Sequence, residues 1–219
     1  MTLKLYAHPF SSYCQKVLIA LYENGTAFEW CLVAPDHPAA GEELAALWPL
    51  KRMPLLLDGA HAVFESSIVI EYLDQHHPGQ IQLIPADADA ALDARMLDRF
   101  IDNYIHTPLQ KMVFDRLRPE ADRDSFGIGE ARAMLDAAYA WLDQRMAGHD
   151  WGVADTFSLA DCAAAPALFY ADWAHPIPES LGHLNAYRQR LLARPSFARA
   201  VEEARPYRSY FPLGAPDRD

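Results

Sequence analysis

The sequence predicts an α/β domain followed by an all-helical domain. Two observations lead to this prediction: short strand-like runs alternate with helical patterns in the first part of the chain, and only helical patterns follow them. The first domain is expected at residues 1–78, a linker at 79–88 and the helical domain at 89–219. With 219 residues, 51% of them hydrophobic and 22% charged, the chain can bury sizeable cores.

A strand and a helix are expected at the start of the chain. Leu3–Ala7 alternates apolar and polar side chains as a half-buried strand does, and from Tyr13 apolar residues recur at helical spacing up to the Asn-Gly pair at 24–25. Ser11 and Ser12 therefore lie at a strand-to-helix turn. Such a turn favours an anion, because its backbone N–H groups are free and the helix dipole is positive there.

The remaining elements of the first domain are expected to complete a sheet that is covered by helices. Branched and aromatic residues predict strands, prolines interrupt them, an Asp-Gly pair predicts a tight turn, and a serine at 66 or 67 is expected to cap a helix. The expected elements are a strand at 27–33, a helix at 42–47, strands at 54–57 and 62–64, and a helix that ends near 77. The order strand, helix, strand, helix, strand, strand, helix (βαβαββα) requires a mixed four-stranded sheet with helices on both faces, because crossover helices join parallel strands and tight turns join antiparallel ones.

Beyond the linker, we expect only helices. The long amphipathic segment at 89–117 is expected to bend at Pro108, since proline interrupts helical hydrogen bonding. Ser158 and Asp161 form a capping-box pattern at the start of a further helix. The other helices are expected at 129–146, 162–173, 181–194 and 196–205.

Charge and cysteine content narrow the function. A net charge of -11 argues against nucleic acid or an anionic membrane as partner, because both require clustered Lys and Arg. Cys14, Cys31 and Cys162 are scattered without ligand spacing, so neither a disulfide framework nor a metal site is expected. Neither a membrane span nor a secretory signal is expected. We therefore expect a cytoplasmic protein that acts on small molecules.

The turn at residues 11–14 has the spacing of a C-x-x-C redox turn with serine in the first place. A hydroxyl there can donate a hydrogen bond to the thiolate of a bound thiol and lower its pKa below the usual value of about 8.5. Two interpretations of Ser11 stay open on the turn alone. One is this thiolate role, and the other is a plain N-cap, for which serine is a preferred residue.

Three sequence elements together resemble glutathione transferases over nearly the whole chain. They are KRMPLL at 51–56, FESSI at 64–68 and the capping pattern at 158–161. The resemblance implies a thioredoxin-like first domain in which the bond before Pro54 is cis. It also implies that the backbone of Met53 pairs with an extended peptide as an added strand does. Glutathione is such a peptide.

The resemblance implies the residues that bind glutathione. Ser66 is expected to hold the γ-glutamyl carboxylate at a helix start, and Glu65 the γ-glutamyl ammonium group. Arg52 is expected to hold the glycyl carboxylate. A plain helix cap for Ser66 and a solvated side chain for Arg52 are the alternatives. The full expected set is Ser11, Ser12, Arg52, Met53, Pro54, Glu65 and Ser66, with Ser11 as the catalytic residue.

Other thiol-activating groups are also considered. The turn is similar to the Ser-Ser-Cys turn of zeta-type transferases, but Tyr13 replaces the cysteine, Gln15 an aromatic residue and Arg52 a glutamine. Tyr6 on the first strand is the alternative suggested by the tyrosine-based classes. Cys14 is the residue that a thiol-disulfide or peroxide reductase would use, although its place in the helix favours burial.

The resemblance implies transfer of the glutathione thiolate to a small hydrophobic electrophile. The electrophile is expected in an apolar cleft lined by Phe10, Tyr104, Pro108 and Met112, with the aromatic tail Tyr207, Tyr210 and Phe211 nearby. Glutathione is the expected co-substrate, and no metal is expected. The alternatives are a glutathione-dependent isomerase of the maleylacetoacetate type, a reductase, and a non-catalytic glutathione-binding protein.

A homodimer is implied as well. In the family, an acidic side chain from the partner's long helix helps to hold the γ-glutamyl amine. Asp98 and Asp102 are the candidates for this role.

Overall fold

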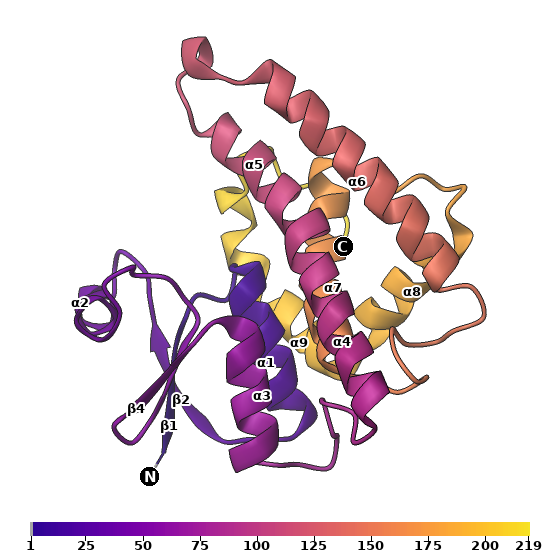
Figure 1. Ribbon diagram of the computed structural model, residues 1–219. Coiled ribbons are helices and arrows are strands. Elements are labelled where there is room, and N and C mark those ends of the chain that lie inside the picture. Colours follow the sequence, from indigo (N-terminus) through magenta and orange to yellow (C-terminus); the bar gives the residue numbers. More distant parts are fainter. Residues whose placement is uncertain (1) are drawn as a thin grey trace.

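The computed structural model describes residues 2–219 and contains an α/β domain and a helical domain that lie against each other (Figure 1). The elements of the first domain are β1 (Leu3–Ala7), α1 (Ser12–Glu23), β2 (Phe28–Leu32), α2 (Pro38–Leu47), β3 (Leu55–Asp58), β4 (His61–Phe64) and α3 (Ser66–His76). Their order is the predicted one.

The four strands form one mixed sheet in the order β2-β1-β3-β4. β1 runs parallel to β2 and antiparallel to β3, and β3 runs antiparallel to β4. The helical crossover accounts for the parallel pairing of β1 with β2, and the tight turn accounts for the antiparallel pairing of β3 with β4, as the sequence predicted. The antiparallel pairing of β1 with β3 follows from neither connection.

Alternation along β1 places helices on both faces of the sheet. Leu3, Leu5 and Ala7 join the large core that includes α1 and α3, whereas Tyr6 packs with Leu44 of α2 on the opposite face. Figure 1 shows α2 apart on one side, with α1 and α3 between the sheet and the helical domain. The start of α1 therefore faces the second domain.

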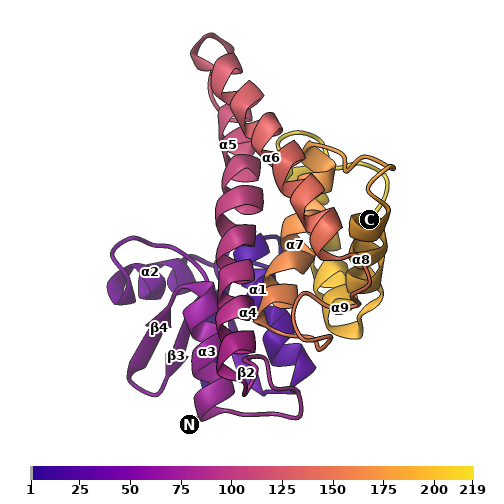
Figure 2. The ribbon, with the colours of Figure 1, turned by 45° about the vertical axis from the view of Figure 1, so that its right-hand side comes forward.

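The second domain is helical. Its elements are α4 (Ala88–Ile101), a π-helical turn (Asp102–His106), α5 (Thr107–Arg116), a 3₁₀ turn (Glu120–Asp122), α6 (Ser125–Arg145), α7 (Leu159–Ala174), α8 (Gly182–Ala193), α9 (Pro195–Ala204) and a 3₁₀ turn (Arg205–Tyr210). α4, the π turn and α5 continue one another as a single rod, beside which α6 runs back (Figure 2). We call these three elements the α4–α5 rod.

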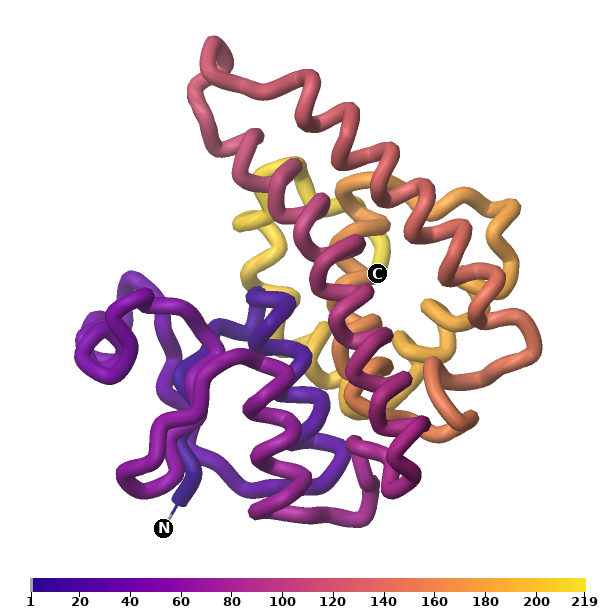
Figure 3. Tube along the Cα trace, in the orientation of Figure 1, coloured from indigo at the N-terminus to yellow at the C-terminus, as the bar shows by residue number. Residues whose placement is uncertain are grey.

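α7 lies at the centre of the helical domain and is buried along almost its whole length. The predicted capping box begins it: the backbone N–H of Ser158 donates to Asp161 Oδ2 at 2.9 Å. α1 packs against α7 and α9, which joins the two domains. The chain passes from α3 to α4 at one end of the molecule (Figure 3).

Three local predictions were wrong. Neither Ser66 nor Ser67 is the N-cap of α3; Glu65 takes that position with a positive φ of 66° and makes no side-chain capping bond. α2 begins at Pro38 rather than at 42, because proline is well tolerated in the first turn of a helix. The rod is interrupted by the π turn that precedes Pro108, rather than bent at the proline itself.

Candidate functional site

A groove with a volume of about 460 Å³ lies between the loops of the first domain and the α4–α5 rod. It is lined by the turn before α1, the loop before β3, the start of α3 and one face of the rod. The lining residues of the first domain are Ser11, Tyr13, Trp48, Lys51, Arg52, Met53, Pro54, Glu65 and Ser66, and those of the rod are Arg99, Asp102, Asn103, Thr107, Gln110 and Phe114.

The groove brings together the residues predicted to bind glutathione, with one exception. Ser11, Arg52, Met53, Pro54, Glu65 and Ser66 all line it. Ser12 lies in the first turn of α1 and does not line it. The bond between Met53 and Pro54 is cis, as the resemblance implied.

Ser11 takes the N-cap role that its sequence position left open, and it also lines the groove, where the thiolate role stays a prediction. It is the N-cap of α1, and its Oγ accepts a long hydrogen bond of 3.4 Å from the backbone N–H of Cys14. Its own backbone N–H donates to the carbonyl of His8 at 3.0 Å, which fixes the turn. The Ser11 hydroxyl lies beside the buried Cys14 thiol and also lines the groove, so it can turn to donate its proton to a ligand there.

Charged side chains with no ion-pair partner stand on the first-domain wall of the groove. Lys51, Arg52 and Glu65 are exposed, and none of them forms an ion pair within the described part of the chain. Lys51 and Glu65 also adopt positive φ angles of 52° and 66°, which cost roughly 1–3 kcal/mol each in a non-glycine residue and cluster at ligand-binding sites. This wall therefore carries positive and negative side chains that can each pair with the opposite charge of a zwitterionic ligand.

A buried ion cluster lies behind the groove. Lys16 of α1 is fully buried and forms ion pairs with Asp98 and with Asp102, the latter at 3.3 Å. Arg99 pairs with both aspartates from the groove side. Ser67 connects the cluster to α3, because its Oγ accepts from Lys16 Nζ at 2.9 Å and donates to Asp98 Oδ2 at 2.8 Å. We use the term ion cluster for Lys16, Asp98, Arg99 and Asp102.

Asp98 and Asp102, the candidates for holding an amine bound to a second chain, belong to this ion cluster. Both carboxylates are buried and pair with Lys16 and Arg99 of the same chain, and Asp102 also lines the groove, so their role toward a second chain stays a prediction. Burial alone would raise the pKa of Asp102, but the hydrogen bond with His106 and the charges of Lys16 and Arg99 lower it to about 2.

Tyr13, in the turn that begins α1, lines the groove. Its ring lies 4.5 Å from the ring of the buried His106. Burial, aided by the nearby Asp102 carboxylate, raises the pKa of Tyr13, so its hydroxyl keeps its proton and can donate it in a hydrogen bond.

The alternative thiol-activating residues lie elsewhere. Tyr6 faces α2, where its hydroxyl donates to Glu43 Oε2 at 2.8 Å, and it does not line the groove. Burial raises the pKa of Tyr6 further. Cys14 is completely buried, and burial raises the pKa of its thiol to about 11, so the thiolate needed by a reductase is disfavoured.

The structure does not place the four residues predicted to wall the second substrate in the groove. Pro108 and Met112 are buried in the helical domain, and Tyr104 is exposed on the rod, with its ring 5.2 Å from the ring of Phe100. Successive helical residues are turned by about 100°, so Arg99, Asn103 and Gln110 share the groove face instead. Sequence periodicity identified the apolar side of the rod, but it did not show that the polar side of the rod lines the groove.

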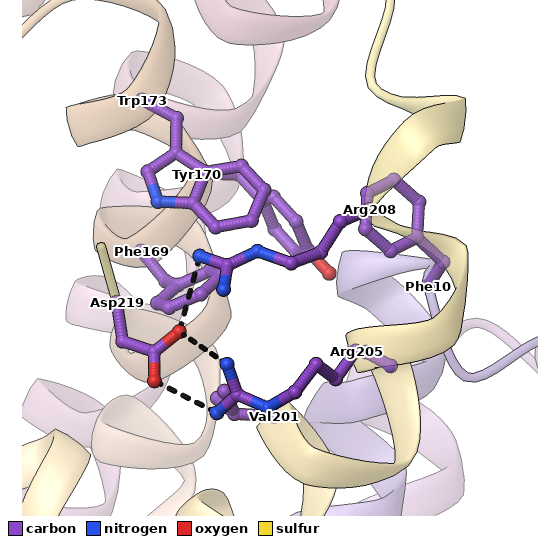
Figure 4. Close-up of a pocket in the computed structure, with 9 residues that line it drawn as sticks. Phe10, Phe169, Tyr170, Trp173, Val201, Arg205, Arg208 and Asp219 are labelled. Carbon is purple, nitrogen blue, oxygen red and sulfur yellow. Dashed lines mark hydrogen bonds and ion pairs between the residues drawn. The ribbon is translucent and has the colours of Figure 1, made fainter. Parts of the chain in front are cut away.

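Phe10 lines a different and much smaller cavity (Figure 4). Its volume is about 10 Å³, room for about one water molecule. Arg205 and Arg208 reach across it to the Asp219 carboxylate, and Arg208 lies 4.8 Å from the Trp173 ring. Of the aromatic tail, Tyr207 packs edge-on against His8 at 4.6 Å. The tail thus supports the turn before Ser11 without lining the groove.

In the described part of the chain, no group of three or more His, Cys, Asp or Glu side chains is arranged to hold a metal ion. The same residues form no helix long and apolar enough to span a membrane.

The chain matches two family models. The N-terminal domain of glutathione S-transferases matches residues 5–80, and the C-terminal domain of the same family matches residues 81–190.

Similar proteins have names that describe different functions. A stringent starvation protein A homolog of Coxiella burnetii is 28% identical over 91% of each chain. A glutathione S-transferase of Silene vulgaris is 27% identical over 92% of this chain and 97% of its own. A maleylpyruvate isomerase of Ralstonia sp is 30% identical over 76% of this chain and 81% of its own.

Solved structures agree with the fold. A glutathione S-transferase of Methylobacterium radiotolerans, in complex with glutathione sulfonate, superimposes with a TM-score of 0.80 at 32% identity over 92% of this chain and 95% of its own. One from Methylobacillus flagellatus, with glutathione bound, gives a TM-score of 0.81 at 26% identity over 91% of this chain and 98% of its own.

Proposed function

Because this chain belongs to the glutathione S-transferase family, we propose that it transfers the sulfur of glutathione to a small electrophilic molecule. The observation that carries the proposal is the position of the Ser11 hydroxyl. It stands at the positive end of α1 and lines the same groove as Met53, Glu65 and Ser66.

Glutathione fits the first-domain wall of the groove by charge. Its ammonium group pairs with Glu65, its γ-glutamyl carboxylate accepts from Ser66 at the start of α3, and its glycyl carboxylate pairs with Arg52. The backbone of Met53 pairs with the cysteinyl backbone. This arrangement directs the sulfur toward Ser11.

Ser11 then stabilises the ionised sulfur. Its hydroxyl donates a hydrogen bond to the thiolate, and the α1 dipole favours the negative charge, so both lower the pKa of the bound thiol. The thiolate attacks an electrophile held beside it, with proximity supplying much of the rate.

An ultraviolet titration of bound glutathione tests this role. The thiolate absorbance of the wild-type complex is expected to have its midpoint at least one pH unit below that of Ser11→Ala, since one unit corresponds to about 1.4 kcal/mol of thiolate stabilisation. Ser12→Ala is the comparison, because Ser12 does not line the groove, and its midpoint should match the wild type. Equal midpoints in wild type and Ser11→Ala would remove Ser11 from this role.

A glutathione-dependent isomerase is the second candidate. The 30% identity to a maleylpyruvate isomerase favours it. An isomerase adds and then releases glutathione, so turnover without consumption of glutathione distinguishes it from a transferase.

We also propose a homodimer that works in the cytoplasm. An apolar stripe of Leu92, Met96, Phe100 and Tyr104 follows the rod at four-residue spacing, and three of its members are more than a third exposed. A second copy of the chain would cover this surface. All three cysteines are free, which fits a reducing compartment.

A further inference from the structure

Ser11 is the last residue of a tight turn, His8-Pro9-Phe10-Ser11, that links β1 to α1. The backbone N–H of Ser11 donates to the His8 carbonyl at 3.0 Å, which closes the turn, and proline at the second position favours such a turn through its fixed φ. The position of the Ser11 hydroxyl therefore depends on the groups that hold this turn.

The side chain of His8 is one of these groups. Its Nδ1 accepts a hydrogen bond of 3.1 Å from the backbone N–H of Phe10. Asn and Asp side chains make the same kind of bond, to a backbone group two residues on, in Asx turns. Because His8 is buried, water does not readily replace this acceptor.

The hydrogen bond requires a neutral imidazole. A ring nitrogen accepts a hydrogen bond only when it carries no proton, so the proton of the neutral ring is on Nε2. Burial lowers the pKa of His8 and outweighs the opposing effect of the Asp36 carboxylate. His8 is therefore neutral near pH 7 and can accept from Phe10.

The ring of His8 is itself held in place by the helical domain. The ring of Tyr207 packs edge-on against it with the centroids 4.6 Å apart, and the ring of Tyr210 stacks on it at 6.3 Å. Both tyrosines belong to the 3₁₀ turn that follows α9. Gln15 of α1 separately binds the turn, because its Nε2 donates to the Pro9 carbonyl at 2.9 Å.

Resting on the thiolate role proposed above for Ser11, we propose that His8 is a positioning residue, whose Nδ1 holds the turn so that the Ser11 hydroxyl reaches the glutathione sulfur. His8 does not line the groove, so it acts through Ser11 rather than on the substrate. Misplacement of a catalytic group by about 1 Å can cost roughly 100-fold in rate. Loss of the Nδ1 acceptor should therefore weaken thiolate stabilisation although Ser11 is still present.

Two substitutions separate the acceptor of His8 from its ring. His8→Asn keeps an acceptor, because the asparagine Oδ1 is bonded to Cγ as the histidine Nδ1 is, but it loses the ring that packs against Tyr207. His8→Phe keeps an aromatic ring and loses the acceptor. In the ultraviolet titration of bound glutathione, we expect the thiolate midpoint to rise by about one pH unit in His8→Phe, a tenfold change in the ionisation constant, and to stay at the wild-type value in His8→Asn.

A double-mutant cycle tests whether His8 acts through Ser11. His8→Phe should not change the midpoint of Ser11→Ala, because the hydroxyl to be positioned is no longer there. His149→Phe is the matched control: His149 is exposed after α6 and does not line the groove, so its midpoint should equal that of the wild type.

Three results would overturn the assignment of His8. They are a wild-type midpoint in His8→Phe, an equal rise in His8→Asn, which would assign the effect to packing of the ring, and additive shifts in the cycle. If circular dichroism shows that His8→Phe is unfolded, His8→Leu, which also lacks the acceptor, takes its place. All three results leave the thiolate role of Ser11 standing, whereas equal midpoints in wild type and Ser11→Ala, or no glutathione binding by calorimetry, overturn the proposed function itself.

Discussion

The side chain of Lys16 is completely buried, which is unusual for a lysine. Lysine is almost never fully buried unless it is paired, and here its ammonium group touches two carboxylates and the Ser67 hydroxyl. Such a charge contributes little net stability compared with apolar packing, but loss of one partner leaves the others buried and uncompensated. Because Lys16 lies one helical turn after Ser12, the cluster also holds the start of α1 against the rod.

Replacement of Lys16 by methionine is expected to destabilise the protein. The change leaves the buried Asp98 and Asp102 carboxylates with Arg99 as their remaining cation, and the expected loss is about 3–5 kcal/mol in the free energy of unfolding. Urea unfolding of Lys16→Met and wild type measures it. Lys111→Met is the control, because the exposed Lys111–Asp124 pair at 3.7 Å should contribute no more than about 1 kcal/mol. Equal losses in the two variants would contradict the cluster's role.

At the scale of elements, the sequence predicted what local patterns determine. The chain order of the strands and helices in the first domain, the Ser11 turn and the capping box of α7 each depend on residues close together in the chain, and all three appear in the structure. The ion cluster was not predictable in this way, because its members lie on α1 and α4 and at the π turn, and only tertiary packing brings them together.

The groove face of the rod escaped prediction for a related reason. Apolar periodicity marks the buried side of a helix, and Met112 lies on that side, but the pattern does not show which neighbour the polar side meets. Four-residue spacing of Arg99 and Asn103 was the signal available in the sequence.

The π turn makes stability depend on pH through Asp102. Its folded pKa of about 2 lies below the ordinary value of 3.8, so the ionised form stabilises the fold. The contribution is fully present above pH 3.8 and is lost as the pH falls toward about 2. We expect a loss of roughly 2 kcal/mol across this window from Asp102 alone. Urea unfolding between pH 2 and 6 should show a flatter profile for Asp102→Asn, and parallel profiles would assign the loss to other groups.

At the scale of the whole molecule, packing of the two domains positions the groove. α1 contacts α7 and α9 through apolar residues, and the ion cluster fixes the rod to α1 and α3. The groove is therefore bounded by elements that cannot separate without exposing buried charge. The apolar stripe of Leu92, Met96, Phe100 and Tyr104 lies outside this arrangement.

The proposed dimer, in which a second copy of the chain covers this stripe, can be tested by sedimentation. Leu92 is 65% and Met96 41% exposed, and a carboxylate introduced at position 96 would, in a dimer, lose its hydration without gaining a cation. We expect the wild type to sediment as a dimer at micromolar concentration and Met96→Glu to sediment as a folded monomer. Phe126→Glu, at the start of α6, is the control: Phe126 is 76% exposed but lies outside the stripe, so this variant should remain dimeric. A monomeric wild type, or a dimeric Met96→Glu, would show that the stripe is not the subunit interface.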